Sequence, residues 1–160
     1  MATTSRAPLL RRLVAAATLA LVGSTFAAAV DTAAALVTDR LRAVSHQKEC
    51  RVATTGRRTG NPHTVTTWFV VEGDSIYLGT LDASRDWVRN ASAARRVAID
   101  FGTLAVTGTF TEVTDPQVAA RVREALERKY WMAWFGGWFG KGPERTFRVG
   151  DLQVAGDRGA

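Results

Sequence analysis

The fold of this 160-residue chain is decided by residues 51–81, which read RVATTGRRTGNPHTVTTWFVVEGDSIYLGTL. Residues 51–55 and 63–72 are rich in β-branched and aromatic side chains, a composition typical of strands. Two glycines and a proline at 56–62 predict a turn between them. Gly73 and Asp74 then reverse the chain into a third strand, residues 75–81. We therefore expect the first three strands to form a meander.

The rest of the chain adds two helices and three strands. Ser84 is the expected cap of a helix over residues 85–93, and Asp115 with Pro116 is typical of a helix start. Further strands are expected over residues 97–101, 104–113 and 145–154. Six short strands and flanking helices predict a closed antiparallel barrel. Val, Ile, Leu and Phe would fill its narrow bore, so a cofactor would lie outside the barrel or in a dimer groove.

Composition narrows the chemistry. Apolar residues make up 46% of the chain and charged residues 22%, which excludes a disordered polymer. A single cysteine, Cys50, excludes a disulfide framework and a thiolate metal cluster, and His46 and His63 are too far apart for a helix-borne zinc pair. The net charge of +6 favours an anionic partner. No RNP motif or recognition helix is present, so we expect no nucleic acid partner. The lack of clustered cysteine and histidine ligands predicts no metal site.

The first thirty residues have the features of a targeting segment. Three arginines precede an apolar run over residues 13–30, and the small residues 27–29 match a signal cleavage site. The run is also long enough to span a bilayer as an uncleaved anchor, and a true start further downstream is the third alternative. We expect an exported or membrane-anchored protein, or a cytoplasmic one at the membrane face if the segment is not real. Residues 31–48 would form a helix and residues 49–160 the barrel domain.

A glycine-flanked basic turn, TTGRRTG at residues 54–60, is the strongest local motif. Glycines at both ends expose backbone amides as an anion-binding nest, and Arg57, Arg58 and Thr59 add two cations and a hydroxyl. The alternative is an ordinary hairpin turn with solvated arginines. Beyond it, Thr64, Thr66 and Trp68 share one strand face that suits an aromatic heterocycle.

Aromatic residues gather in two later segments. Trp87, Arg89 and Asn90 would offer a wall, a cation and an amide from one helix, unless Trp87 is simply a core residue. Residues 130–139 hold three of the five tryptophans among glycines. This segment is interpreted as a mobile lid over a flat substrate, as an interfacial membrane anchor, or as packing over an open barrel end.

Two of these stretches together resemble a known family. TTGRRTGNPHTVTTWFV at 54–70, followed by DWVRNASAARRVAI at 86–99, is similar to the deazaflavin-dependent nitroreductases and quinone reductases. These enzymes belong to the pyridoxamine-phosphate-oxidase-like split barrels. The likeness covers residues 51–113, with a looser match near Tyr130. It departs from the family pattern at residues 81–83 and at Asp86, which leaves the choice of cofactor open.

The resemblance implies a mainly β (α+β) fold, a six-stranded antiparallel split β-barrel with flanking helices, usually dimeric, that binds coenzyme F420 or FMN. It implies cofactor contacts from the basic turn, the next two strands and the first helix of the barrel: Arg57, Arg58, Thr59, His63, Thr64, Val65, Thr66, Trp68, Gly79, Thr80, Leu81, Trp87, Val88, Arg89 and Asn90.

The activity expected from this resemblance is hydride transfer from reduced F420, or FMN, to a planar acceptor such as a quinone or a nitroaromatic compound. From the aromatic segment itself, Trp131 and Trp134 are expected to contact the acceptor, and residue type makes Tyr130 the expected proton donor. The alternative is a non-catalytic split barrel that binds flavin or haem. A homodimer is expected, with membrane association through the N-terminal segment.

Overall fold

The computed structural model describes residues 34–131 and 143–155. The chain divides into two compact units, Met1–Leu36 and Val37–Ala160, and only residues 34–36 of the first unit are described. The expected leader, residues 1–30, and Trp134 lie outside the described residues. Residues 34–44 are helical, within the segment 31–48 expected to hold a helix. Within the described ranges, no helix is long and apolar enough to cross a membrane.

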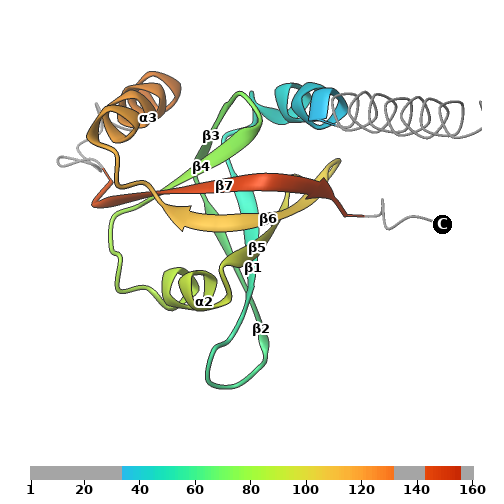
Figure 1. The fold of residues 1–160 in the computed structure, drawn as a ribbon, viewed down its shortest axis with the longest axis vertical. Coiled ribbons are helices and arrows are strands. Elements are labelled where there is room, and N and C mark those ends of the chain that lie inside the picture. Colours follow the sequence, from blue (N-terminus) through green and yellow to red (C-terminus); the bar gives the residue numbers. More distant parts are fainter. Residues whose placement is uncertain (1–33, 132–142, 156–160) are drawn as a thin grey trace, which may run out of the picture. The chain divides into compact units, whose positions relative to one another are not determined.

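The second unit contains one curled antiparallel sheet of seven strands (Figure 1). In chain order the strands are β1 (Cys50–Thr55), β2 (Pro62–Thr67), β3 (Phe69–Glu72), β4 (Ser75–Thr80), β5 (Arg96–Asp100), β6 (Ala105–Glu112) and β7 (Arg145–Val154). In the sheet their order is β2-β1-β5-β6-β7-β4-β3. The two edge strands, β2 and β3, are separated by Trp68 alone. Both edges therefore meet at this residue, and the expected mainly β split barrel is confirmed.

Two helices follow β4 and β6 and flank the sheet, α2 (Asp86–Ala94) and α3 (Pro116–Lys129); the helix before β1 adds Leu41 and Val44 to the core. The predicted start of α3 is confirmed, because the Asp115 carboxylate accepts hydrogen bonds from the backbone N–H groups of Gln117 and Val118. The predicted cap of α2 is wrong by one residue. Arg85 is the N-cap and makes no side-chain capping bond. Ser84 cannot cap the helix, because its backbone N–H and its hydroxyl both donate to the Asp82 carboxylate.

The expected meander is also wrong, since the strand predicted over residues 63–72 is two strands. β2 pairs with β1, with Val65 opposite Val52, whereas β3 pairs with β4, with Phe69 opposite Leu78. Between them, Trp68 stacks on Tyr130 from the C-terminal end of α3, with ring centroids 4.5 Å apart. This tertiary contact divides the ladder, so the sheet has seven strands rather than six.

The inner face of the sheet carries the main hydrophobic core. Alternating side chains point inward along β5 and β6, and they pack against inward side chains of the other strands: Val52, Ile76, Leu78, Val97, Ile99, Val106, Phe110, Phe147 and Val149. These residues fill the bore, as predicted. A second cluster lies on the outer face, where α3 packs on β3 and β4 through Val70, Tyr77, Val122, Leu126 and Tyr130. A binding site must therefore lie outside the bore.

Candidate functional site

A cleft of about 200 Å³ opens where both halves of the barrel meet the two helices. It is formed by the end of β2 and the junction to β3, the end of β4 with the residue after it, the start of α2, and the C-terminal part of α3. Its lining consists of Val65, Thr66, Thr67, Trp68, Gly79, Thr80, Leu81, Arg85, Trp87, Leu126, Tyr130 and Pro143. Elements distant in the sequence thus converge on one site.

Two tryptophans give the cleft its aromatic walls. Trp68 is held parallel to the Tyr130 ring, with an interplanar angle of 6°. Trp87 is 4% exposed and makes edge contacts with Phe110 and Phe147 in the core. Because both indoles are fixed by packing, the cleft presents preformed aromatic surface. Trp87 is thus both a core residue and part of the cleft lining, so the two interpretations of Trp87 from the sequence, a core residue and an aromatic wall, both apply.

The Tyr130 hydroxyl is engaged by backbone rather than directed at a ligand. It accepts a hydrogen bond from the Phe69 N–H, and it lies 2.7 Å from the Lys48 carbonyl oxygen and 2.9 Å from that of Phe69. Burial raises the pKa of Tyr130 to about 12. A hydroxyl that donates to carbonyls and holds its proton this strongly is a poor general acid. The geometry therefore favours a positioning role for Tyr130 over the expected proton donation.

Lys129 completes the support of the strand junction. Its ammonium donates to the Phe69 carbonyl at 2.9 Å and lies 3.6 Å from the centroid of the Phe69 ring. Burial lowers the pKa of Lys129 to about 8. Lys129 and Tyr130 together satisfy both backbone polar groups of Phe69, the residue that follows Trp68. The end of α3 thereby fixes Trp68 at the cleft.

The glycine-flanked turn does not form the anion nest expected from its sequence. The backbone N–H of Gly56 donates to Asn61, that of Gly60 to Gly56, and that of Asn61 to the Thr59 hydroxyl. The Arg57 N–H donates to the Asn90 side chain. Four amides of the turn are thus already used within the protein, which argues against the predicted nest.

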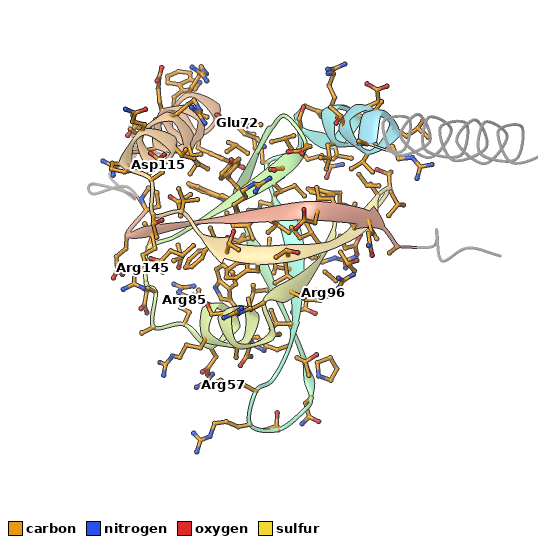
Figure 2. The ribbon with its side chains drawn as sticks, in the orientation of Figure 1. Arg57, Glu72, Arg85, Arg96, Asp115 and Arg145 are labelled. Atoms are coloured by element: carbon orange, nitrogen blue, oxygen red, sulfur yellow. The ribbon has the colours of Figure 1, made fainter. Side chains whose placement is uncertain are left out.

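The Arg57 side chain is also committed to the protein. Its guanidinium lies 3.2 Å from the Asp86 carboxylate and 3.1 Å from the Asn90 side-chain oxygen. Figure 2 shows Arg57 at the start of the loop between β1 and β2, near α2. These bonds fasten the hairpin to α2. Arg58 makes no ion pair with any described residue and remains available to solvent.

The cleft brings together about half of the predicted site. Its lining includes seven of the expected cofactor residues, Val65, Thr66, Trp68, Gly79, Thr80, Leu81 and Trp87, together with Tyr130. The other eight do not line it: Arg57, Arg58, Thr59, His63, Thr64, Val88, Arg89 and Asn90. Val88 is buried in the core, and Arg89 donates to the Ser84 carbonyl. Trp131, an expected acceptor contact, is 56% exposed and is not in the lining.

Sequence reasoning missed four lining residues, Thr67, Arg85, Leu126 and Pro143. Leu126 belongs to the apolar stripe of α3 and could be interpreted only as a core residue. Arg85 had a signal, since it immediately precedes a helix whose start also bears Trp87. Arg85 is the single charged side chain in the described lining, which contains no carboxylate.

A second hollow near Cys50 lacks comparable chemistry. It is lined in part by Glu49, Arg51 and Asp100, of which the last two form an ion pair. The Cys50 thiol is buried, and burial raises its pKa to about 12, so it is a weak nucleophile. The described residues contain no group of three His, Cys, Asp or Glu side chains that could hold a metal ion.

Residues 40–139, which include most of the cleft, match the family described as "Uncharacterized protein conserved in bacteria (DUF2255)". The chain belongs to the DUF2255 family. No curated protein matches its sequence. In this DUF2255 chain the match extends from the helix before β1 to beyond α3.

Solved structures share the fold of this DUF2255 chain. A candidate pyridoxamine 5′-phosphate oxidase from Listeria innocua is 12% identical, with a TM-score of 0.54 over 73% of this chain and 96% of its own. The haem storage protein HutZ from Vibrio cholerae is 15% identical, with a TM-score of 0.53 over 74% and 94%. An F420-H2-dependent reductase is 16% identical, with a TM-score of 0.51 over 64% and 94%. At such identities the likeness establishes the split-barrel fold alone.

Proposed function

We propose that this chain is a split-barrel oxidoreductase that binds coenzyme F420 or FMN and reduces a planar acceptor, such as a quinone or a nitroaromatic compound. The observation that carries the proposal is the aromatic-walled cleft outside the filled bore, lined by Trp68 and Trp87. When bound, the reduced coenzyme supplies a hydride, and a quinone takes up this hydride with one further proton from water. Structural neighbours named for oxidase and F420-dependent reductase activities support the same class.

The size and lining of the cleft fit the ring of such a coenzyme. Pockets that enclose a whole drug-sized ligand measure roughly 300–1,000 Å³, whereas this cleft measures about 200 Å³. It would hold a ring system and leave a ribityl phosphate tail outside. Thr66 and Thr67 lie on opposite faces of β2, so one of the two would offer its hydroxyl to the polar edge of the ring. Trp87 would bound the ring on one side. The protein's part is to orient the ring and exclude water from it.

The cation nearest to the ring would be Arg85 rather than the pair expected from the basic turn. Arg85 lines the cleft, while Arg57 is bonded to Asp86 and Asn90. Of the two arginines of the basic turn, Arg58 alone makes no ion pair within the described residues. We therefore assign no proton transfer to Tyr130 and no phosphate contact to Arg57.

The described lining argues against the haem-binding alternative. Haem iron in proteins is held by His, Cys, Met or Tyr side chains. The described lining has no His, Cys or Met, and the hydroxyl of its one tyrosine is bonded to backbone. Haem storage by the structural neighbour HutZ therefore does not suggest the same use of this cleft.

Spectroscopic titration tests the proposal directly. The purified full-length chain is titrated with FMN, with F420 and with haem, and binding is followed by the absorption change of each compound. Reduced F420 and reduced FMN are then mixed with protein and menadione, and their oxidation is recorded. We expect one of the two coenzymes to bind with a micromolar or lower Kd and to be oxidised faster with protein than without it.

Filling the cleft provides the site-specific control. A Cβ at Gly79 would lie 3.1 Å from the Pro143 side chain and 3.4 Å from Leu126, so Gly79→Ala narrows the cleft between β4 and α3. We expect the variant to bind the coenzyme at least fivefold more weakly at an unchanged circular dichroism spectrum. Thr109→Val, on β6 and outside the lining, is the matched control and should bind normally. Binding of neither coenzyme, or binding of haem alone, would refute the proposal.

A further inference from the structure

Arg85 gives the cleft an electrostatic character that its other residues lack. All the remaining lining side chains are neutral, and no carboxylate is among them within the described residues. Figure 2 shows Arg85 and Arg57 on different sides of α2. A lone cation beside aromatic surface distinguishes ligands by charge as well as by shape.

The arginines at this end of the cleft have acids near them. Asp86 is paired with Arg57, so these two charges balance each other. Asp82 interacts with both Arg85 and Arg89, and its carboxylate accepts two hydrogen bonds from Ser84. The Glu144 carboxylate accepts from the Ala83 backbone N–H at 3.2 Å, so a second acid lies near this segment. The surroundings are therefore close to neutral, and the positive charge that a ligand would meet is that of Arg85 in the lining itself.

The guanidinium of Arg85 is free to meet a ligand. It makes no hydrogen bond or ion pair with the residues that the structure describes, in contrast to Arg89, whose side chain donates to the Ser84 carbonyl at 2.7 Å. Arg85 is also the N-cap of α2, which has no side-chain cap. The positive end of the helix dipole therefore acts in the same direction as the side chain.

We propose that the cleft selects planar aromatic ligands that bear one anionic group, and that Arg85 is the residue that makes this selection. The inference names the ligand class of the cleft used in the proposed function, but it does not require the ligand to be a flavin. It replaces Arg57 and Arg58, the cations favoured by the sequence, with a residue that lies in the cleft itself.

An isosteric pair of probes tests this selection. Naphthalene-2-carboxylate and naphthalene-2-carboxamide share one ring system and differ in charge. Binding to the full-length chain is measured by isothermal titration calorimetry and by quenching of tryptophan fluorescence. We expect the carboxylate to bind about five- to tenfold more tightly than the amide, the size of one charge-assisted hydrogen bond at an open site. This preference should shrink as salt is raised.

Substitutions assign the preference to Arg85. Arg85→Gln should weaken binding of the carboxylate about five- to tenfold and leave that of the amide within twofold. Arg58→Gln, an exposed arginine outside the lining, is the matched control and should change neither. Leu81 lines the cleft and is 49% exposed, so Leu81→Asp is tolerated by the fold and should weaken the carboxylate selectively.

Each result bears on this proposal separately from the proposed function. Equal binding of the two probes to the unmodified chain, no binding of either, or an unchanged preference in Arg85→Gln would overturn the selection by Arg85. If the preference holds and neither FMN nor F420 binds, the selection stands and the oxidoreductase proposal fails. If a coenzyme binds and is oxidised but the two probes bind equally, the oxidoreductase proposal stands and the selection by Arg85 fails.

Discussion

Tyr130 connects α3 to the point where the two edges of the sheet meet, and it does so through one hydroxyl. This hydroxyl accepts from the Phe69 N–H and lies within hydrogen-bond distance of two carbonyl oxygens. We expect Tyr130→Phe to lower the free energy of unfolding by about 1–3 kcal/mol, because buried backbone groups lose their partner. Urea denaturation followed by far-ultraviolet circular dichroism measures the change.

Tyr77 provides the control for this substitution. It belongs to the same cluster under α3 and is 7% exposed, but its hydroxyl makes no hydrogen bond with the described residues. Tyr77→Phe removes the same atom without breaking a hydrogen bond. It should therefore lower the free energy of unfolding by less than about 0.5 kcal/mol. Equal costs for the two variants would show that the Phe69 contacts do not stabilise the junction.

The buried ammonium of Lys129 should make the stability of the fold depend on pH. Burial lowers its pKa from 10.5 to about 8 in the folded chain, so the folded state binds fewer protons than the unfolded state between these values. Stability therefore rises with pH through this window, and the cost of burying the charge is fully present below pH 8. Relative to Lys129→Met, the native chain should gain about 1–2 kcal/mol from pH 8 to 10.5, after a discount for partial exposure.

Urea denaturation of both proteins at pH 6, 7, 8, 9 and 10 tests this expectation. Cys50 and Tyr130 are present in both proteins, so their own titration cancels in the difference apart from the electrostatic interaction between Cys50 and Lys129. The difference in unfolding free energy should be flat below pH 7 and should change only above it. A difference that is constant up to pH 10 would place Lys129 in a more aqueous setting than the contacts with Phe69 imply.

At the scale of elements, Asn90 fastens the β1–β2 hairpin to α2. Its side-chain oxygen accepts from the backbone N–H and from the guanidinium of Arg57, both at 3.1 Å, and the residue is 5% exposed. Asn90→Ala should destabilise the fold by about 1–3 kcal/mol. It should also release the hairpin, so that trypsin cuts after Arg57 or Arg58 severalfold faster.

Two variants separate this fastening from general damage. Asn90→Asp keeps the accepting oxygen and should retain most of the protection against trypsin. Arg58→Ala changes the same turn at a residue without an ion pair in the described part of the chain, and it should leave stability unchanged. If Asn90→Ala is cut no faster than the native chain, the hairpin is held by its strand pairing with β1 alone.

The elements themselves were largely predictable, because their signals are local. Alternation identified β5 and β6, and the aspartate–proline pair identified the start of α3. The break at Trp68 was not predictable, since it depends on Tyr130, 61 residues beyond Phe69. The candidate site divides in the same way between residues that sequence could place and contacts that it could not. Trp68, Gly79 and Trp87 could be placed near one another by resemblance, whereas the commitment of Arg57 to Asn90 depends on contacts that no spacing reveals.

At the scale of the whole molecule, the pairing of β6 with β7 joins the two halves of the sheet. β2, β1, β5 and β6 lie on one side of this ladder, and β7, β4 and β3 on the other. The register shifts between Thr107 and Thr109, and Gly108 occupies the shift. The joint therefore depends on a residue at which the two strands approach closely.

Gly108 has no room for a side chain, so substituting it tests how much the pairing of β6 with β7 stabilises the fold. An added Cβ would lie 2.6 Å from the Gly150 carbonyl oxygen and from Leu152, and 2.8 Å from Val149. Because a backbone oxygen in a ladder cannot move aside, Gly108→Ala should cost about 1–3 kcal/mol. At Gly150 the nearest atoms to an added Cβ belong to the Arg148 guanidinium, 3.0 Å away, which is a side chain held by Ser75 and Asp74 rather than backbone. Gly150→Ala should therefore cost less than Gly108→Ala. Thermal and urea unfolding compare the two. Equal losses would mean that the joint tolerates a wider bulge and that closure of the barrel rests on the chain connection at Trp68 instead.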